Sequence, residues 1–570
     1  MLRIRICISG PRGTRASGLD ASISLAELSL VHRTSIFCRS LLLILFAGFL
    51  ALPVLAVLGS WWPWGQGDGQ AWHILHEMAA TVLPRYAWTT LWLGVLVAVG
   101  AAVVGTCTAA AVTLFDFPGR RTLEWLLLLP LAMPAYVTAY AYTDFLQFSG
   151  PLQAGLRSAF GLEGRVLPEI RSLGGAVWVF IFSLYPYVYL LARTALGERA
   201  AHLMEAARLL GAPLPRRIRA VALPLARPAV AAGVALVLME TLADFGVSSY
   251  FGIQTFTTGI YKAWLSMDNR LAAAQLATML LAVVVLLLHL EQRAQQRMRF
   301  ASVGGRGGST EAQPLVLRGG RRWLAWAVCA LPVLMGFVAP VAFMLRPLAA
   351  DWAALPWERF LEWAWHSVRL GGITAVLAVL AALTLAFALR RRPDPVTRGV
   401  VRLASLGYAV PGAVIVVGLL LPVGWLQAVV PHWGVGALVT ATSFGIVWAY
   451  LVRFCAVALQ SVQSGYARIP VSLDDLARML GVGSLGLLSR VHWPLLKRST
   501  AAAALLVFVD VMKELPATMV LRPFNSDTLA VVAYQLARDE RLGEAALPSL
   551  ALVAVGLVPV ILLSRTLRSR

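Results

Sequence analysis

The segment EAARLLGAPLPRRIRAVALP, from Glu205 to Pro224, is polar and basic, yet it lies between apolar stretches long enough to cross a membrane. A near copy, DLARMLGVGSLGLLSRVHWP, runs from Asp475 to Pro494, and six of the twenty positions are identical in the two copies. A membrane chain that carries the same polar segment twice is expected to consist of two similar halves, each with one such segment outside the membrane.

Each copy has the features of a short helix that leads into a membrane helix. Glu205 or Asp475 stands near its start, where the helix dipole favours an acid. Gly211 or Gly481 is expected to end the helix, because glycine adopts the left-handed conformation that helix ends often need. The proline that closes each copy is expected to open the next membrane helix, where its missing N–H costs little. The short helix could lie on lipid headgroups, but the duplication favours docking on a partner that is itself a dimer.

The composition identifies an integral membrane protein. Of the 570 residues, 59% are hydrophobic and 14% are charged, and the mean hydropathy is +0.74, whereas about a quarter of residues are charged in soluble domains. The formal net charge of +21 comes from arginines between the apolar stretches, which is typical of cytoplasmic loops and gives no reason to expect nucleic-acid binding. The five cysteines show no CxxC spacing, so neither a disulfide framework nor a thiolate metal site is predicted.

We predict an all-α polytopic membrane protein with about twelve transmembrane helices, because a spanning helix needs about 20 mainly apolar residues. The predicted spans are roughly 39–60, 87–115, 122–146, 173–196, 226–246, 271–290, 322–345, 364–389, 400–423, 434–460, 500–521 and 546–565. Arginine-rich segments alternate with segments that are poorer in net positive charge, so both termini are predicted to be cytoplasmic.

A Gly- and Arg-rich stretch at 300–321 divides the chain. Its composition predicts a flexible cytoplasmic linker. The linker separates a first six-helix domain at 38–299 from a second at 322–570, and residues 1–37 are predicted to be a disordered polar extension.

The two domains match each other along their length. When their sequences are aligned, Pro134 falls over Pro411, and Gly211 falls over Gly481 further on. Because six is an even number of spans, the two halves share one orientation, and we expect a pseudo-two-fold axis along the membrane normal.

The spacing E-A-A-x-x-x-G, followed after twelve residues by proline, resembles the cytoplasmic signature of binding-protein-dependent ABC importer permeases. The residues that carry the resemblance are Glu205, Ala206, Ala207, Gly211 and Pro224 in the first copy and Asp475, Leu476, Ala477, Gly481 and Pro494 in the second. The resemblance implies the two-domain fold of type I importer permeases, in which this segment is a coupling helix that docks on an ATPase subunit. The second copy departs from the usual Glu and Ala at its first two positions, so its docking is expected to be weaker or differently shaped.

The resemblance also implies the partners and the location of the protein. It implies two copies of an ABC ATPase subunit, a periplasmic substrate-binding protein, and a place in a bacterial inner membrane. ATP and Mg²⁺ are then expected on the partner subunit, with no cofactor on this chain. In agreement, Lys262, Lys497 and Lys513 are the only lysines, and none is followed by Ser or Thr, so the Gly-Lys-Ser/Thr phosphate loop is missing and no enzymatic activity is predicted.

Three further stretches look like the ferric-iron branch of these fused permeases, namely 130–153, 239–264 and 512–537. The resemblance implies transport of ferric iron. Two alternatives stay open: a fused ABC permease for thiamine or another small solute, and a twelve-helix secondary transporter, which also has two like-oriented halves. A membrane enzyme is disfavoured because the sequence shows no grouped catalytic residues.

Acids within predicted spans are candidates for a substrate pathway, because a charge in the membrane is costly. The candidates are Glu240, Asp244, Asp510 and Glu514, joined by Tyr140 and Tyr142, and carboxylate oxygens suit a hard cation such as ferric iron. In the alternative interpretation, these acids pair with Lys513 or with Arg193 and Arg453, which are predicted at matching cytoplasmic ends of the fourth and tenth helices. No resident metal site is assigned.

Overall fold

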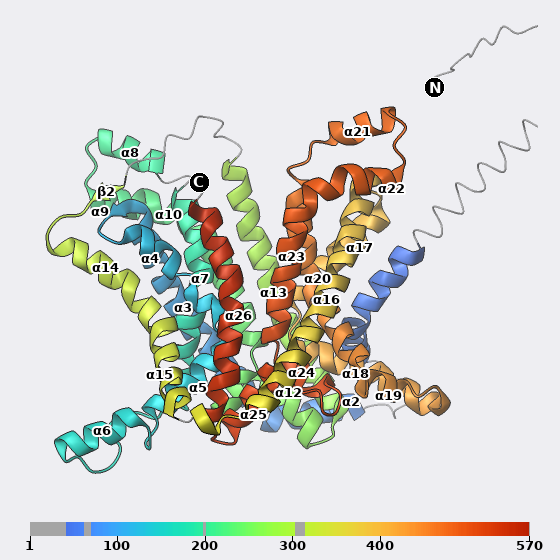
Figure 1. Cartoon of the computed structure of the whole chain (residues 1–570), viewed down its shortest axis with the longest axis horizontal. Coiled ribbons are helices and arrows are strands. Elements are labelled where there is room, and N and C mark those ends of the chain that lie inside the picture. Colours follow the sequence, from blue (N-terminus) through green and yellow to red (C-terminus); the bar gives the residue numbers. More distant parts are fainter. Residues whose placement is uncertain (1–40, 62–69, 198–200, 303–313, 351, 569–570) are drawn as a thin grey trace, which may run out of the picture.

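A computed structural model describes residues 41–61, 70–197, 201–302, 314–350 and 352–568 of the chain. The predicted polar extension at 1–37 lies outside these residues. Within them the protein is almost entirely helical, and its long helices run roughly in one direction across the molecule (Figure 1).

The first half begins with a helix at Leu41–Gly59 and continues with α2 (Gln70–Thr81), α3 (Leu83–Leu114), α4 (Arg120–Leu126), α5 (Ala135–Leu146), α6 (Pro151–Phe160), α7 (Leu173–Ala195), α8 (Ala201–Leu209), α9 (Leu214–Arg217), α10 (Leu223–Ala243), α11 (Gly246–Tyr250), α12 (Phe256–Tyr261) and α13 (Arg270–Ser302). The second half contains α14 (Gly320–Val333), α15 (Ala339–Ala350), α16 (Trp357–Arg391), α17 (Pro395–Leu406), α18 (Gly412–Val429), α19 (Val435–Thr440), α20 (Ser443–Tyr466), α21 (Val471–Met479), α22 (Ser484–Gly486), α23 (Trp493–Lys513), α24 (Pro516–Leu521), α25 (Leu529–Arg538) and α26 (Leu542–Arg568).

Ten helices of the described chain are long and apolar enough to cross a membrane, or eleven if the bent pair Arg120–Ala132 and Ala135–Phe160 counts as one span. The remaining predicted span, 500–521, corresponds to α23. This helix is 21 residues long, and its charged residues lie near its two ends. It packs against α16 and α20, as α10 packs against α3 and α7 in the first half, so we count it as a span and the total is about twelve.

Two predicted spans are broken rather than continuous. The span predicted at 122–146 consists of α4, a 3₁₀ turn at Leu129–Ala132 and α5, with a bend of 91°. The span predicted at 400–423 is divided in the same way into α17, a 3₁₀ turn and α18. Pro134 and Pro411 stand directly before α5 and α18 with nearly the same backbone angles, φ −59° and ψ 142° against φ −58° and ψ 142°. A proline cannot donate the hydrogen bond of a continuous helix, which explains a break at both positions.

The two halves exchange their first helices. In the helix Leu41–Gly59, Phe49 stacks on Trp448 of α20 with the ring centres 4.5 Å apart, and the Trp448 indole N–H donates to the Phe49 carbonyl at 2.9 Å. In return α14 packs against α3 and α4, and the Tyr142 hydroxyl of α5 donates to the Met335 carbonyl at 2.7 Å. The first helix of each half therefore packs against the other half. The predicted boundaries at 38–299 and 322–570 do not indicate this packing.

The far end of the predicted linker is fixed to the first half. Strand β1 (Phe115–Asp116), which follows α3, pairs in parallel with β2 (Leu315–Val316), and the Leu317 amide donates to the Asp116 carbonyl at 3.0 Å. Residues 303–313 of the linker lie outside the described residues.

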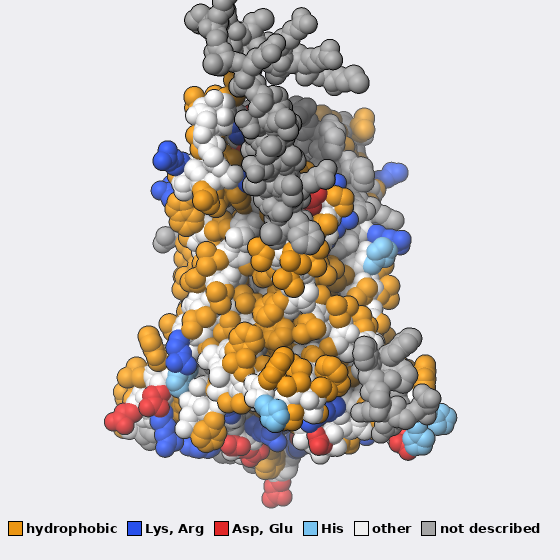
Figure 2. Space-filling model, turned by 90° about the vertical axis from the view of Figure 1, so that its right-hand side faces the viewer, with side chains coloured by type: hydrophobic (Ala, Val, Ile, Leu, Met, Phe, Trp, Pro, Cys, Tyr) orange, Lys and Arg blue, Asp and Glu red, His pale blue; other side chains and the backbone are white. Residues whose placement is uncertain are grey.

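The surface shows how the molecule sits in a membrane. On the face drawn in Figure 2, hydrophobic side chains cover the middle, and charged side chains gather toward the two ends. The short helices α8 and α21 lie at the same end of the molecule, on opposite sides of it, whereas α12 and α25 lie at the other end (Figure 1). The two copies of the repeated segment thus face the same side of the membrane, as an even number of spans per half predicts.

Candidate functional site

The two copies of the repeated segment have the same local structure. In the first, the Gly211 amide donates to the Arg208 carbonyl and the Ala212 amide to the Ala207 carbonyl, both at 3.0 Å. In the second, the amides of residues 481 and 482 repeat these two bonds with carbonyls of residues 478 and 477 at the same distances. Gly211 and Gly481 have φ values of 79° and 74°, so each ends its helix in the left-handed conformation that the sequence predicts.

The prolines that close the two copies also occupy matching places. Pro224 and Pro494 are each the second residue of a membrane helix. A π-helical turn precedes each of them, at Ile218–Ala222 and at Leu487–His492. We attribute the wider turn to the proline, whose ring and missing N–H do not fit the regular α-helical ladder.

The helices α8 and α21 expose apolar side chains beside their signature residues. Leu209 and Leu210 are 85% and 87% exposed at the end of α8, and Met479 and Leu480 are 85% and 74% exposed at the end of α21. Glu205 and Ala206 of α8 are exposed, as are Asp475 and Leu476 of α21, whereas Ala207 is half-buried and Ala477 is buried. Apolar side chains that project from the end of a molecule mark an interaction surface.

A central cavity of about 190 Å³ lies between the two halves. It is lined by residues of α5, α7, α10, α20 and α23 and of the turns next to them. Its charged and polar lining residues are Glu240, Asp244, Asp510, Glu514, Arg453, Lys513, Tyr136, Tyr187, Tyr408 and Ser183. All four acids predicted for the pathway are therefore brought together, and they outnumber the two basic residues.

Two of the four acids lie at breaks in the membrane helices, where each accepts hydrogen bonds from the start of the next short helix. α10 ends at Ala243, and Asp244 Oδ1 accepts hydrogen bonds from the amides of Val247 and Ser248 at 2.9 and 3.4 Å, where α11 starts. Glu514 plays the same part after α23: its carboxylate accepts from the amides of residues 517 and 518, each at 3.1 Å. The predicted spans 226–246 and 500–521 do not continue through these acids, because each acid caps a new short helix.

The other two acids, Glu240 and Asp510, also occupy matching positions when Gly211 is aligned with Gly481. Glu240 Oε1 accepts a hydrogen bond from the Tyr408 hydroxyl at 2.9 Å. Asp510 interacts electrostatically with Lys513 and Glu240, and the Lys513 ammonium group donates to the Leu131 carbonyl at 3.0 Å. These two carboxylates come from α10 and α23 themselves and not from the breaks that follow these helices.

The two arginines considered as partners of the acids lie in different places. Arg453 is in the middle of α20 and forms an ion pair with Glu514 at 3.2 Å. Arg193 is in the last turn of α7 and pairs with Glu124 of α4. The expectation that both stand at matching cytoplasmic ends is wrong, because the alignment of α7 with α20 from their first residues places Ser183, not Arg193, at the position of Arg453.

One of these tyrosines lines the cavity, and two are buried in packing contacts away from it. Tyr136 lines the cavity, but Tyr140 and Tyr142 are not among the lining residues. Tyr140 is 1% exposed and packs its ring 4.7 Å from that of Tyr250, and the hydroxyl of Tyr142 binds the Met335 carbonyl. Sequence reasoning missed Tyr187 and Tyr408, since an isolated tyrosine in an apolar span gives no signal.

Two hydrogen bonds join the halves at the end of the molecule away from α8 and α21. The Tyr261 hydroxyl donates to the Pro516 carbonyl at 2.7 Å, and the Ser249 and Tyr534 hydroxyls are 2.7 Å apart. These residues belong to α11, α12, α24 and α25. The helices α12, α24 and α25 lie at the end opposite to α8 and α21 (Figure 1).

The carboxylates surround the cavity without forming a preformed metal site. Within the described residues, no three His, Cys, Asp or Glu side chains are grouped closely enough to hold a metal ion. The arrangement can attract a cation and let it pass, since a pathway must bind weakly enough to release what enters.

Comparisons with known proteins agree with this architecture. Residues 94–300 match the family model described as binding-protein-dependent transport system inner membrane component. The Fe(3+)-transport system permease protein FbpB 2 of Haemophilus influenzae is 25% identical over 84% of this chain and 88% of its own length. The ferric transport system permease protein FbpB of Actinobacillus pleuropneumoniae is 22% identical over 91% of this chain and 76% of its own. The sulfate transport system permease protein CysT of Salmonella typhimurium is 30% identical over 35% of this chain and 73% of its own.

Proposed function

Because this chain belongs to the family of binding-protein-dependent transport system inner membrane components, we propose that it carries ferric iron across the bacterial inner membrane. It is the multi-pass membrane subunit of an ABC importer, and it works with an ATPase and a periplasmic binding protein. It is not itself the enzyme of the complex.

We propose that α8 and α21 are the two docking helices and that each contacts one copy of the ATPase subunit, which binds ATP and Mg²⁺. Three observations support this assignment: the two helices lie at the same end of the molecule, they end at glycines in the same conformation, and they expose apolar side chains. That end is then cytoplasmic, and with an even number of spans both termini are cytoplasmic too.

The observation that carries the substrate proposal is the charge of the central cavity. Four acids and two bases line it, together with three tyrosines. An oxyanion such as sulfate would be repelled by this excess of negative charge, whereas a hard cation is attracted to carboxylate and phenol oxygens. Two FbpB relatives that match most of this chain are described as ferric or Fe(3+) permeases, which supports the same substrate.

The deciding experiment is uptake of radiolabelled ferric iron in cells with and without this gene, with labelled thiamine and sulfate in parallel. We expect deletion to abolish the uptake of ferric iron alone. Loss of thiamine or sulfate uptake with intact iron uptake would keep the permease and reject the substrate. Uptake that collapses with the proton gradient while ATP persists would instead indicate a secondary transporter.

A further inference from the structure

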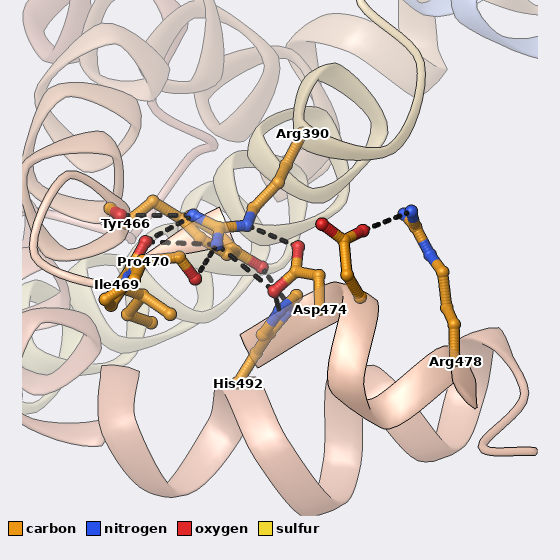
Figure 3. A network of polar contacts seen from close by, with 8 residues as sticks. Arg390, Tyr466, Ile469, Pro470, Asp474, Arg478 and His492 are labelled. Carbon is orange, nitrogen blue, oxygen red and sulfur yellow. Dashed lines mark hydrogen bonds and ion pairs between the residues drawn. The ribbon is translucent and has the colours of Figure 1, made fainter. Parts of the chain in front are cut away.

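A buried polar network holds α21 against the membrane helices (Figure 3). The Asp474 carboxylate accepts hydrogen bonds from Arg390, through Nε at 2.7 Å and a terminal nitrogen at 3.1 Å, and it lies 3.0 Å from His492 Nε2. Asp474 and His492 are 2% and 0% exposed. Burial would raise the pKa of Asp474, but the hydrogen bonds and charges of Arg390 and His492 outweigh it and hold this pKa below its ordinary value.

The same arginine also binds the backbone where α20 ends. The terminal nitrogens of Arg390 donate to the carbonyls of Tyr466, Ile469 and Pro470 at 3.0 to 3.2 Å (Figure 3). Carbonyls at a helix end have no partner within the helix. A guanidinium group satisfies them and the carboxylate together because its five donors form a rigid planar fork, which a lysine lacks.

The network therefore joins four elements at one point. Arg390 belongs to α16, the carbonyls to the end of α20, Asp474 to α21, and His492 to the π turn that leads into α23. The three membrane helices α16, α20 and α23 also pack against one another. Any displacement of α21 is thus applied to a tightly packed group of three helices.

In the first half, the equivalent helix α8 is held against the membrane helices by different side chains. The alignment of Gly211 with Gly481 places Met204 over Asp474 and Ala222 over His492, and the alignment of Pro134 with Pro411 places Thr113 over Arg390. Met204 and Ala222 are 7% and 1% exposed, so they are buried like their counterparts. Neither side chain can form an ion pair, and α8 is seated through apolar packing at these positions.

We propose that Arg390, Asp474 and His492 are positioning residues that transmit movement of α21 to α16, α20 and α23, so that the ATPase drives the two halves of this chain unequally. The inference rests on the proposed docking of α8 and α21 on the ATPase. The second half is driven through a directional, charged linkage. The first half is driven through apolar contacts, which allow more sliding because they are not directional.

The test exchanges the chemistry of the two halves. The variant Arg390→Thr/Asp474→Met/His492→Ala places the first-half residues in the second half and leaves no buried charge without a partner. The intact complex, with ATPase and binding protein, is reconstituted in liposomes, and iron transported is measured per ATP hydrolysed. We expect this ratio to fall about tenfold, within the range typical of coupling between sites, while the ATPase still co-purifies.

Three further variants separate transmission from folding. Glu358→Gln, which removes an exposed charge in the first turn of the same helix α16, is the control and should leave the ratio unchanged. His492→Gln keeps an N–H donor toward Asp474 and should retain most of the coupling. Asp474→Asn keeps the shape of the side chain but removes its charge, and it should lose most of the coupling. This pair of variants tests the proposal even if the triple variant does not assemble.

An unchanged ratio in the triple variant or in Asp474→Asn would overturn the proposal. Loss of ATPase binding would overturn it as well, because the network would then only shape the docking surface. If the wild-type complex neither binds the ATPase nor transports iron, it is the proposed function that fails.

Discussion

Arg453 Nη1 lies 3.2 Å from Glu514 Oε1, and this ion pair joins the middle of α20 to the break after α23 at the wall of the central cavity. The two side chains are only 13% and 2% exposed. The α18 backbone passes so close that a β-carbon at Gly412 would lie 2.9 Å from the same carboxylate oxygen. In the first half the corresponding pair is Asp244 and Ser183, with no arginine, so the pseudo-symmetry of the cavity is broken at this point.

The first prediction concerns the stability of this pair. Replacing Glu514 with Ala removes the cap of α24 and leaves the Arg453 charge buried without its partner. We expect a loss of about 3–5 kcal/mol, the usual cost of breaking a buried ion pair from one side, and a clear fall in the midpoint of thermal unfolding in detergent. Glu358→Ala changes an exposed acid of α16 and serves as control. Equal unfolding midpoints for the two variants would show that the pair contributes nothing to stability.

The second prediction separates substrate contact from structure. Glu240→Gln and Asp510→Asn remove one negative charge each from matching positions in the cavity, and neither acid caps a helix break. We therefore expect each to reduce the initial rate of ferric uptake at least fivefold, with the protein level in the membrane unchanged. Glu358→Gln is the control for the same chemical change outside the cavity. Normal uptake in the double variant would exclude these two carboxylates from the pathway.

The sequence allowed the repeat, the number of spans and the four acids of the cavity to be predicted, because all three depend on composition and on spacing along the chain. The helix breaks at Asp244 and Glu514 were missed, since apolar residues continue past both acids and only the local hydrogen bonds show the cap. The exchange of first helices and the packing role of Tyr142 depend on contacts between distant segments. The network around Asp474 did leave a signal in the sequence. Asp474 aligns with Met204 of the first half, so the two copies of the repeat differ here between an acid and an apolar residue.

The third prediction tests the glycines that end α8 and α21. Gly211 and Gly481 have positive φ, and a β-carbon at either would meet nothing within 4 Å. Substitution by alanine is therefore penalised only by the backbone conformation, by about 1–2 kcal/mol. We expect Gly211→Ala/Gly481→Ala to reduce co-purification of the ATPase, and asparagine, which tolerates this conformation, to restore part of it.

The matched control for these substitutions is Gly483→Ala. Gly483 also has open space around its α-carbon, but its φ is −68°. If this variant weakened ATPase binding as much as the double alanine variant, bulk at the surface and not backbone conformation would be responsible.

The fourth prediction concerns pH and the seat of α21. The pKa of Asp474 is lowered in the folded protein, so its contribution to stability is fully present above the unfolded value of about 3.9 and is lost as the pH falls through the folded value. The difference in unfolding midpoint between the wild type and Asp474→Asn should thus shrink as the pH falls below about 4, where Asp474 takes up a proton. A difference that grew as the pH fell below about 4 would contradict the sign of this pKa shift.

The fifth prediction tests whether the contacts opposite α8 and α21 hold the outer side closed. The Ser249 and Tyr534 hydroxyls, 2.7 Å apart, join α11 to α25 across the two halves. Loss of this hydrogen bond costs about 1 kcal/mol, so Tyr534→Phe should make outward opening easier and raise ATPase activity without binding protein by about fivefold. Because both hydroxyls serve one bond, Ser249→Ala should have the same effect, and the double variant should be no more active than either single variant. Additive effects, or an unchanged basal ATPase activity, would show that this contact does not control the outer side.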